Sequence, residues 1–192
     1  NPNPNPNPNK EPMKTFLCAA LTCLCVLLPT RLPAVVVANP RISIGKPLFT
    51  NGNVENLNRL NDGQLADKAW NGGAASPSAP VWVAMKLGAG PDRVLINWCN
   101  HLGAARFNTG VNVPGNYQIQ TSADSTTGAD GTWKSVLTVT GNVFMNRVHA
   151  VDFKGQQWIR LYVTQPTSKS TEIHLLELEA YDVSGGVDDS WM

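Results

Sequence analysis

Apolar and polar residues alternate with a period of two along most of the chain after residue 80. In VWVAMKL (81–87), for example, Val81 and Val83 point one way and Trp82 and Ala84 the other. Such alternation is typical of a β-strand with one buried face. Further runs of this kind and length are RVLINWC (93–99), NYQIQTS (116–122), WKSVLTV (133–139), NRVHAVDF (146–153) and WIRLYVT (158–164). Gly, Pro, Asp and Asn residues separate the runs and indicate turns between strands.

The last run, EIHLLELEAYD (172–182), contains Leu and Glu, which are good helix formers. Alternation nevertheless fits a strand better, because Ile173 and Leu175 share one face. Leu176 and Leu178 then continue that face after a one-residue slip, which a β-bulge would produce. We therefore predict a bulged strand over this run.

Several short strands with turns between them, and no clear amphipathic helix, predict an all-β sandwich of the jelly-roll kind. The sequence contains no internal repeat and gives no sign of a second folded domain. We place the sandwich at residues 39–183.

The N-terminal part has a different composition. Residues 1–12 alternate Asn and Pro, which disfavours any packed structure. Residues 13–38 have a basic start, an apolar run and a small-residue exit, the layout of a secretory signal peptide cleaved after Ala38. A membrane anchor is the alternative, but Pro29 and Arg31 leave the apolar run shorter than a span requires. The Asn-Pro repeat is either upstream of a natural start at Met13 or a true extension.

Removal of residues 1–38 leaves an exported chain with little net charge. Three of the 15 Lys and Arg residues and one of the 14 Asp and Glu residues lie in that segment, so 12 basic and 13 acidic residues remain, a charge of −1. Such a balance argues against nucleic acid or an anionic membrane as the main partner. Only Cys99 of the four cysteines remains, which excludes an intrachain disulfide. A bound metal or a large core must therefore stabilise the domain.

Candidate metal chemistry lies in LNRLNDGQLADKAW (57–70). Asp62 and Gly63 form a turn, Asp67 follows five residues later, and Trp70 ends the segment. A tight loop with carboxylates and free backbone carbonyls suits calcium, which takes six to eight oxygen ligands. The alternative is an ordinary Asp-Gly turn before a core tryptophan, because the segment is not an EF-hand.

An ordered set of short motifs covers roughly residues 50–183. It consists of the Asp62-Gly63 turn before Trp70, VWVAMKLG (81–88), YQIQTS (117–122), DGTW (130–133), WIRLYV (158–163) and ELEAY (177–181). The set resembles the discoidin, or coagulation factor 5/8 type C, group of galactose-binding-like domains. The resemblance implies a jelly-roll sandwich.

The same resemblance implies a structural calcium that joins the Asp-Gly loop to the closing strand. Its carboxylate ligands would be Asp62 and Glu177, and carbonyl groups around Leu60, Gln64 and Asp67 would complete the shell. The family often has Thr where Asp67 stands, and the spacing from Asp62 to Trp70 is one residue longer than the commonest form. The side chain of Asp67 could itself supply an oxygen.

Sugar-binding members of this group use loops at one end of the sandwich. A sugar offers C–H faces that stack on an aromatic ring and hydroxyl groups that need fixed donors and acceptors. In the loop WCNHLGAARFN (98–108) the candidate polar residues are His101, Arg106 and Asn108, with Trp70 or Phe107 as the aromatic platform. The alternatives are a turn-capping His101 and a solvated Arg106, and Trp98 is expected in the core.

No motif of a Ser-His-Asp hydrolase is present, since the chain has neither G-x-S-x-G nor G-D-S. The region 109–142 and the tail SGGVDDSWM (184–192) resemble the accessory module and linker in front of secreted GDSL-type (SGNH) esterases. The resemblance implies a secreted, non-catalytic carbohydrate-binding module that holds a covalently linked esterase near polysaccharide. The alternative is a structural spacer that packs on the hydrolase domain and has no affinity for sugars.

Overall fold

The alternating runs form strands where the pattern predicts them. The computed structural model describes residues 39–65, 70–100 and 110–186. The predicted runs correspond to β3 (Val81–Lys86), β4 (Arg93–Cys99), β5 (Pro114–Ser122), β6 (Lys134–Val139), β7 (Asn146–Asp152), β8 (Trp158–Pro166), β9 (Ile173–Leu175) and β10 (Glu177–Asp182). Three short elements were not predicted: β1 (Leu48–Thr50), the 3-10 helix η1 (Leu57–Asn61) and β2 (Trp70–Gly73). The predicted all-β class is confirmed. Within the described ranges, no helix is both long and apolar enough to cross a membrane.

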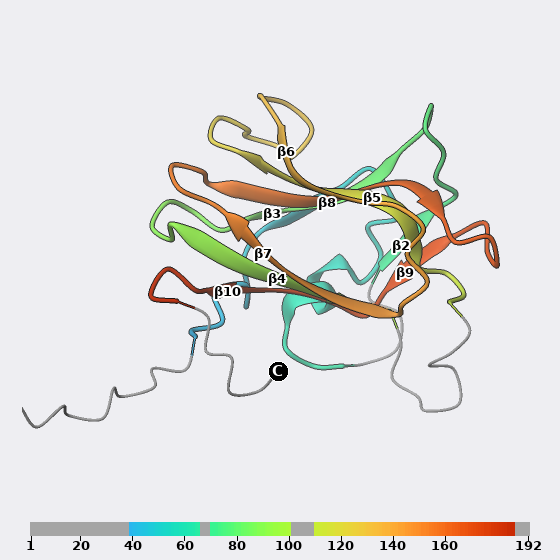
Figure 1. Ribbon diagram of the computed structural model, residues 1–192, viewed down its shortest axis with the longest axis horizontal. Helices are drawn as coiled ribbons and strands as arrows, with labels where there is room; N and C mark the ends of the chain where they lie inside the picture. Colours follow the sequence, from blue (N-terminus) through green and yellow to red (C-terminus); the bar gives the residue numbers. More distant parts are fainter. Residues whose placement is uncertain (1–38, 66–69, 101–109, 187–192) are drawn as a thin grey trace, which may run out of the picture. The chain divides into compact units, whose positions relative to one another are not determined.

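The strands form two facing sheets and a short ribbon. The five-stranded sheet has the order β1-β3-β8-β5-β6, the three-stranded sheet has the order β10-β4-β7, and β2 pairs with β9. All strand pairs are antiparallel. Figure 1 shows the two sheets in separate layers, with β2 and β9 at one end of the strands.

The core lies between the two sheets and is built by the inward half of each alternation. Val83, Ile96 and Leu161 are fully buried, each from a different strand. Trp98 and Tyr117 cross the core from opposite sheets, with ring centroids 5.6 Å apart at an angle of 87°. This edge-to-face contact is a favoured aromatic geometry. The prediction that Trp98 belongs to the core is confirmed.

The slip in the last run is a change of sheet and not the predicted bulge. Residues 173–175 pair with β2, whereas residues 177–182 pair with β4. The backbone N–H of Leu176, between the two strands, donates to the carbonyl oxygen of Cys99. The chain thus leaves the ribbon and enters the three-stranded sheet while Leu175 and Leu176 both stay buried. A bulge and a change of sheet give the same slip in the apolar pattern. Only the strands with which the two halves pair distinguish them, and the sequence does not reveal this pairing.

A histidine lies at the edge of the core between β5 and β7. His149 Nε2 is 2.7 Å from the Tyr117 hydroxyl oxygen. Burial, together with the smaller effect of the neighbouring Arg147 cation, lowers the pKa of His149 from 6.5 to about 4. The folded protein therefore favours the neutral imidazole.

Acid should destabilise the fold through His149. Because its pKa is depressed on folding, the unfolded chain takes up a proton between pH 6.5 and about 4 and the folded chain does not. We expect the free energy of unfolding to fall by about 1–2 kcal/mol over this interval, since partial exposure weakens the effect. Thermal melting at pH 7 and pH 4.5 tests this, with His149→Gln losing less Tm than the wild type. Equal losses in the two proteins would exclude His149 as the cause.

Candidate functional site

One side chain fixes the end of the sandwich at which β4 stops. Asn100 follows β4 and is 6% exposed. Its Nδ2 donates to the carbonyl oxygens of Asn112 and His174, each at 2.6 Å. The chain on either side of segment 101–109 is thereby joined to β9. Figure 1 shows this end on the side of the labels β2 and β9.

A polar cluster surrounds His174 at this end. The amide Nδ2 of Asn112 lies 3.2 Å from His174 Nδ1, and His174 Nε2 lies 3.0 Å from a carboxylate oxygen of Glu172. The hydroxyl of Ser170 donates to Asn112 Oδ1. With Asn112 as donor, Nδ1 accepts and the Nε2–H donates to Glu172, which defines the tautomer of His174. Asn112 has φ 58°, a left-handed conformation that asparagine tolerates.

The outward side of the β2–β9 ribbon presents polar groups to solvent. Asn71 is paired with His174 across the ribbon, while Trp70 and Leu175 point inward. Asn71 Oδ1 accepts from the N–H of Gly73, which leaves its Nδ2 as a donor. The Glu172 side chain is 50% exposed. The ribbon presents an amide donor, Asn71, and the residue before β9 presents a carboxylate acceptor, Glu172; both suit hydroxyl groups.

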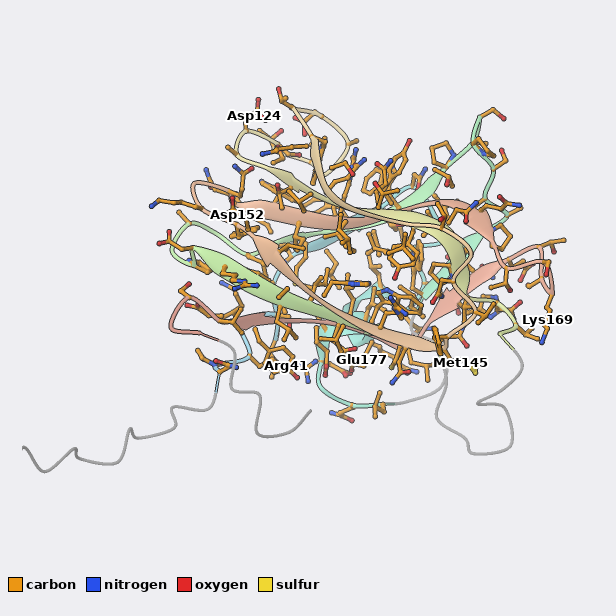
Figure 2. The ribbon with its side chains drawn as sticks, viewed as in Figure 1. Arg41, Asp124, Met145, Asp152, Lys169 and Glu177 are labelled. Carbon is orange, nitrogen blue, oxygen red and sulfur yellow. The ribbon has the colours of Figure 1, made fainter. Side chains whose placement is uncertain are left out.

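A second set of charged groups lies under β10, on the three-stranded sheet. Arg41 Nη2 donates to Glu177 Oε2 at 2.8 Å, and Arg41 Nη1 lies 2.8 Å from Glu179 Oε1. Figure 2 labels Arg41 and Glu177 close together below the sheets. The side chain of Glu177 is only 1% exposed. Burial raises the pKa of Glu177 to about 7, and the negative charges of Glu179 and Asp62 act in the same direction while Arg41 opposes them.

These groups partly fit the implied calcium ligands. Glu177 Oε1 is buried and has no hydrogen-bond partner. Asp62 follows η1, which packs against β10, and its Oδ1 accepts from the N–H of Gln64 at 2.7 Å. Leu60, in η1, is fully buried. The described residues contain no cluster of three or more His, Cys, Asp or Glu side chains suited to a metal, and Arg41 is the cation beside Glu177.

Comparison with solved structures relates this geometry to known domains. Chitosan-binding module 1 of a chitosanase/glucanase from Paenibacillus sp. IK-5 superposes with a TM-score of 0.55 at 20% identity, over 74% of this chain and 99% of that chain. The family 32 carbohydrate-binding module of Streptococcus pneumoniae EndoD gives 0.52 at 21% identity, over 74% and 99%. An F5/8 type C domain from Bacteroides fragilis gives 0.52 at 9% identity, over 72% and 91%. The chain has the jelly-roll fold that these domains share. No protein-family model matches the sequence, and no curated protein matches it.

Within this jelly-roll fold, most of the predicted sugar-binding residues lie outside the described ranges. They are His101, Arg106, Phe107 and Asn108, and the predicted calcium ligand Asp67 lies outside them too. The residues that precede and follow the loop, Asn100 and Gly110, are described. Asn100 is bonded to the backbone of Asn112 and His174, so the polar cluster lies where the described chain stops at Asn100 and resumes at Gly110.

Trp70 is not a sugar platform in this structure, which corrects that part of the prediction. It is 1% exposed, and its indole N–H donates to the hydroxyl of Thr50. A Cβ on Gly72 would come within 2.6 Å of the Trp70 ring, so the ring is packed against the backbone of its own ribbon. A ring without an exposed face cannot stack on a sugar. The alternative of a core tryptophan after the Asp-Gly turn is therefore correct for Trp70.

The polar cluster was missed in the sequence, although part of it had a signal. Glu172 and His174 are two residues apart, and this spacing places both side chains on one face of a strand. Asn112 gave no such signal, since its contact with His174 joins residues that are 62 positions apart.

Proposed function

We propose that the chain is a non-catalytic carbohydrate-binding module whose sugar site lies at the end of the sandwich beside β9. The observation that carries the proposal is the polar set of Asn71, Glu172 and His174, at the end of the jelly roll where the described chain stops at Asn100 and resumes at Gly110. The proposed site includes the predicted residues His101 and Arg106. The similar module from Paenibacillus is named for binding chitosan, and this supports a glycan as the ligand class.

The chemistry of the cluster supports hydroxyl groups as the bound groups. Glu172 accepts hydrogen bonds from hydroxyls, and the free Nδ2 of Asn71 donates to them. The bond between Glu172 and His174 holds the carboxylate in place before a ligand arrives, which lowers the entropy cost of binding. Phe107 remains the candidate aromatic platform, because Trp70 is buried.

Glu172→Gln should weaken retention of the full chain by its polysaccharide about tenfold or more. A hydrogen bond to a charged acceptor contributes about 1.5–3 kcal/mol, and about 1.4 kcal/mol corresponds to tenfold in Kd. Affinity electrophoresis in gels that contain a panel of polysaccharides measures the effect. His101→Ala and Arg106→Ala should also weaken retention.

The matched control is Asp92→Asn, an exposed carboxylate beside Ser184, away from the cluster. It should leave retention unchanged. Absence of retention by every polysaccharide in the panel would contradict the proposal, and so would equal retention of the Glu172 and Asp92 variants.

We further propose a structural calcium bound by Asp62 and Glu177, with the backbone of Leu60 and Gln64 and residue Asp67 as additional oxygen ligands. The support is the buried Glu177 oxygen that lacks a partner and the nearby Asp62 charge, which contributes to the raised pKa of Glu177. When bound, the ion would supply the positive charge that this buried carboxylate needs.

Calcium should then raise the Tm. A ligand that binds only the folded state stabilises it by about 2.7 kcal/mol at a concentration of 100 times Kd. Thermal melting with calcium, with excess chelator and with magnesium as the control ion measures the change. An identical Tm in calcium and in chelator would exclude the site.

In the whole protein, we propose that the module is exported by the segment 13–38 and is linked after residue 192 to an SGNH-type esterase. The support is the sequence resemblance of the tail. The second candidate function, a spacer that packs on the hydrolase domain, is favoured by three exposed apolar side chains near β7: Val143, Phe144 and Val148. A spacer would bind no polysaccharide, so the electrophoresis experiment distinguishes the two functions.

A further inference from the structure

The outer face of the five-stranded sheet carries a row of side chains that the site at β9 does not use. Trp82, Tyr162 and Gln118 lie directly opposite one another on the neighbouring strands β3, β8 and β5. They point away from the core, because Val81, Val83 and Ile119 beside them in sequence point into it. All three side chains of the row are half-buried. Two aromatic rings and an amide therefore share one surface.

An arginine lies beneath this row with aromatic rings around it. The guanidinium carbon of Arg160 is 3.9 Å from the ring centroid of Trp133, 5.1 Å from Tyr162 and 5.7 Å from Trp82. Arg160 is only 8% exposed. Its Nε donates to Gln120 Oε1 at 2.6 Å and its Nη1 to the carbonyl oxygen of Gly128 at 3.1 Å. These contacts hold the three rings around one fixed cation.

Two nitrogen donors on this face lack acceptors within the described chain. Arg160 Nη2 donates to no group there, and it is accessible to solvent. Gln120 Nε2 donates to Gln118 Oε1 at 2.6 Å, so the free Nε2 of Gln118 is turned to the other side of its amide. The hydrogen bonds from Arg160 to Gln120 and from Gln120 to Gln118 thus fix the orientation of both donors.

A rigid loop borders the row on one side. Between β5 and β6, Asp130 accepts hydrogen bonds from the backbone N–H groups and the hydroxyls of Thr126 and Thr127. The indole N–H of Trp133 donates to the carbonyl oxygen of Asp130 at 2.8 Å. A Cβ on Gly128 would lie 3.0 Å from the Ala84 Cβ, so the loop lies directly on the sheet. Figure 2 labels Asp124 in this loop, above the sheet.

We propose that Trp82, Tyr162, Gln118 and the edge of Arg160 form a second saccharide-binding surface, which takes an uncharged polysaccharide chain along the outer sheet face. Sugar rings would stack on Trp82 and Tyr162, and their hydroxyls would accept from Arg160 Nη2 and Gln118 Nε2. The surface is separate from the cluster around His174 and does not depend on it.

The charges around the row favour an uncharged chain. Asp124 and Asp130 lie in the loop that borders the surface. Hydrogen bonds from Thr132 and Ser122 hold the pKa of Asp124 below its usual range, and those from Thr126 and Thr127 do the same for Asp130. Both carboxylates are therefore ionised and would repel an anionic polymer. A hydroxyl-rich neutral chain supplies acceptors for the two free donors without this repulsion.

Affinity electrophoresis of the full chain tests the surface, with glucomannan, galactomannan and hydroxyethyl cellulose as neutral probes and polygalacturonate as the anionic probe. We expect retardation by at least one neutral polymer. Trp82→Ala and Tyr162→Ala should each raise its Kd about tenfold, since one stacking contact contributes up to about 1.5 kcal/mol. Circular dichroism and melting of each variant show whether it is folded.

Phe144→Ala is the matched control, because Phe144 is also a surface aromatic next to an arginine, Arg147, but lies away from this face. It should bind as the wild type does. The surface is refuted if no neutral polymer binds, if polygalacturonate binds best, or if Trp82→Ala and Tyr162→Ala both retain wild-type Kd. Loss of binding in these variants with no effect of Glu172→Gln would support the sheet surface and count against the site at β9. Loss of binding in Glu172→Gln, with wild-type binding by Trp82→Ala and Tyr162→Ala, would support the site at β9 and count against the sheet surface.

Discussion

Arg41→Met should lower the free energy of unfolding by about 3–5 kcal/mol in calcium-free buffer, because it leaves a buried carboxylate without its cation. Arg41 contacts both Glu177 and Glu179 at 2.8 Å, and the Glu177 side chain is 1% exposed. Methionine retains much of the apolar stem, so the change chiefly removes charge. Urea denaturation followed by tryptophan fluorescence measures the loss, provided that the m-value is unchanged.

Arg59→Met is the control for this substitution, since Arg59 is an exposed arginine in η1 with no ion pair among the described residues. It should change stability by less than about 0.5 kcal/mol. If calcium binds Asp62 and Glu177, its addition should restore part of the stability of Arg41→Met, because the ion then replaces the missing positive charge beside Glu177. A loss below 1 kcal/mol without calcium would show that the ion pair contributes little.

Arg160→Ala should destabilise the protein by about 3 kcal/mol and release the loop between β5 and β6. The substitution removes a partly desolvated cation–π contact, for which about 2 kcal/mol is typical, and leaves the buried Gly128 carbonyl without its donor. Limited proteolysis should then cut within residues 123–132 before the rest of the sandwich unfolds. Urea denaturation gives the total loss.

Arg147→Ala is the control for the general effect of removing an arginine that lies over an aromatic ring. Arg147 lies 5.3 Å from the Phe144 ring, but Phe144 is 57% exposed, so its contribution should stay below about 1 kcal/mol. Proteolysis of 123–132 should not change in this variant. Equal stability losses for the two arginines would show that the enclosure of Arg160 by the loop has no energetic effect.

The sequence predicted the long strands well because each one buries every second side chain. Val83, Ile96 and Leu161 are buried as their alternation indicates. The short β1 and β2 contain too few residues for a period to be visible, and pairing with β3 and β9 holds them in place. Propensity and periodicity are local, whereas these pairings join distant parts of the chain.

The candidate sites were less predictable, for a related reason. Trp70 looked suitable as a platform, but whether an aromatic ring is covered depends on residues far away, here Thr50 and the glycine backbone. The approach of Asp62 to Glu177 followed from family resemblance and from no spacing in the chain itself. Arg160 alternates as an outward-facing residue, and only the loop at 123–132 makes it buried.

The side chain of Asn100 separates the sandwich from the loop that follows it. One side-chain amide joins Asn112 and His174 to the end of β4. The positions at which the chain leaves the sandwich and returns to it are therefore set by residues outside 101–109. The two hydrogen bonds use only the Asn100 amide and backbone carbonyl oxygens, so they require no particular side chain between residues 101 and 109. Side chains in that segment can therefore be exchanged without removing the anchor, which makes it a suitable place for protein engineering.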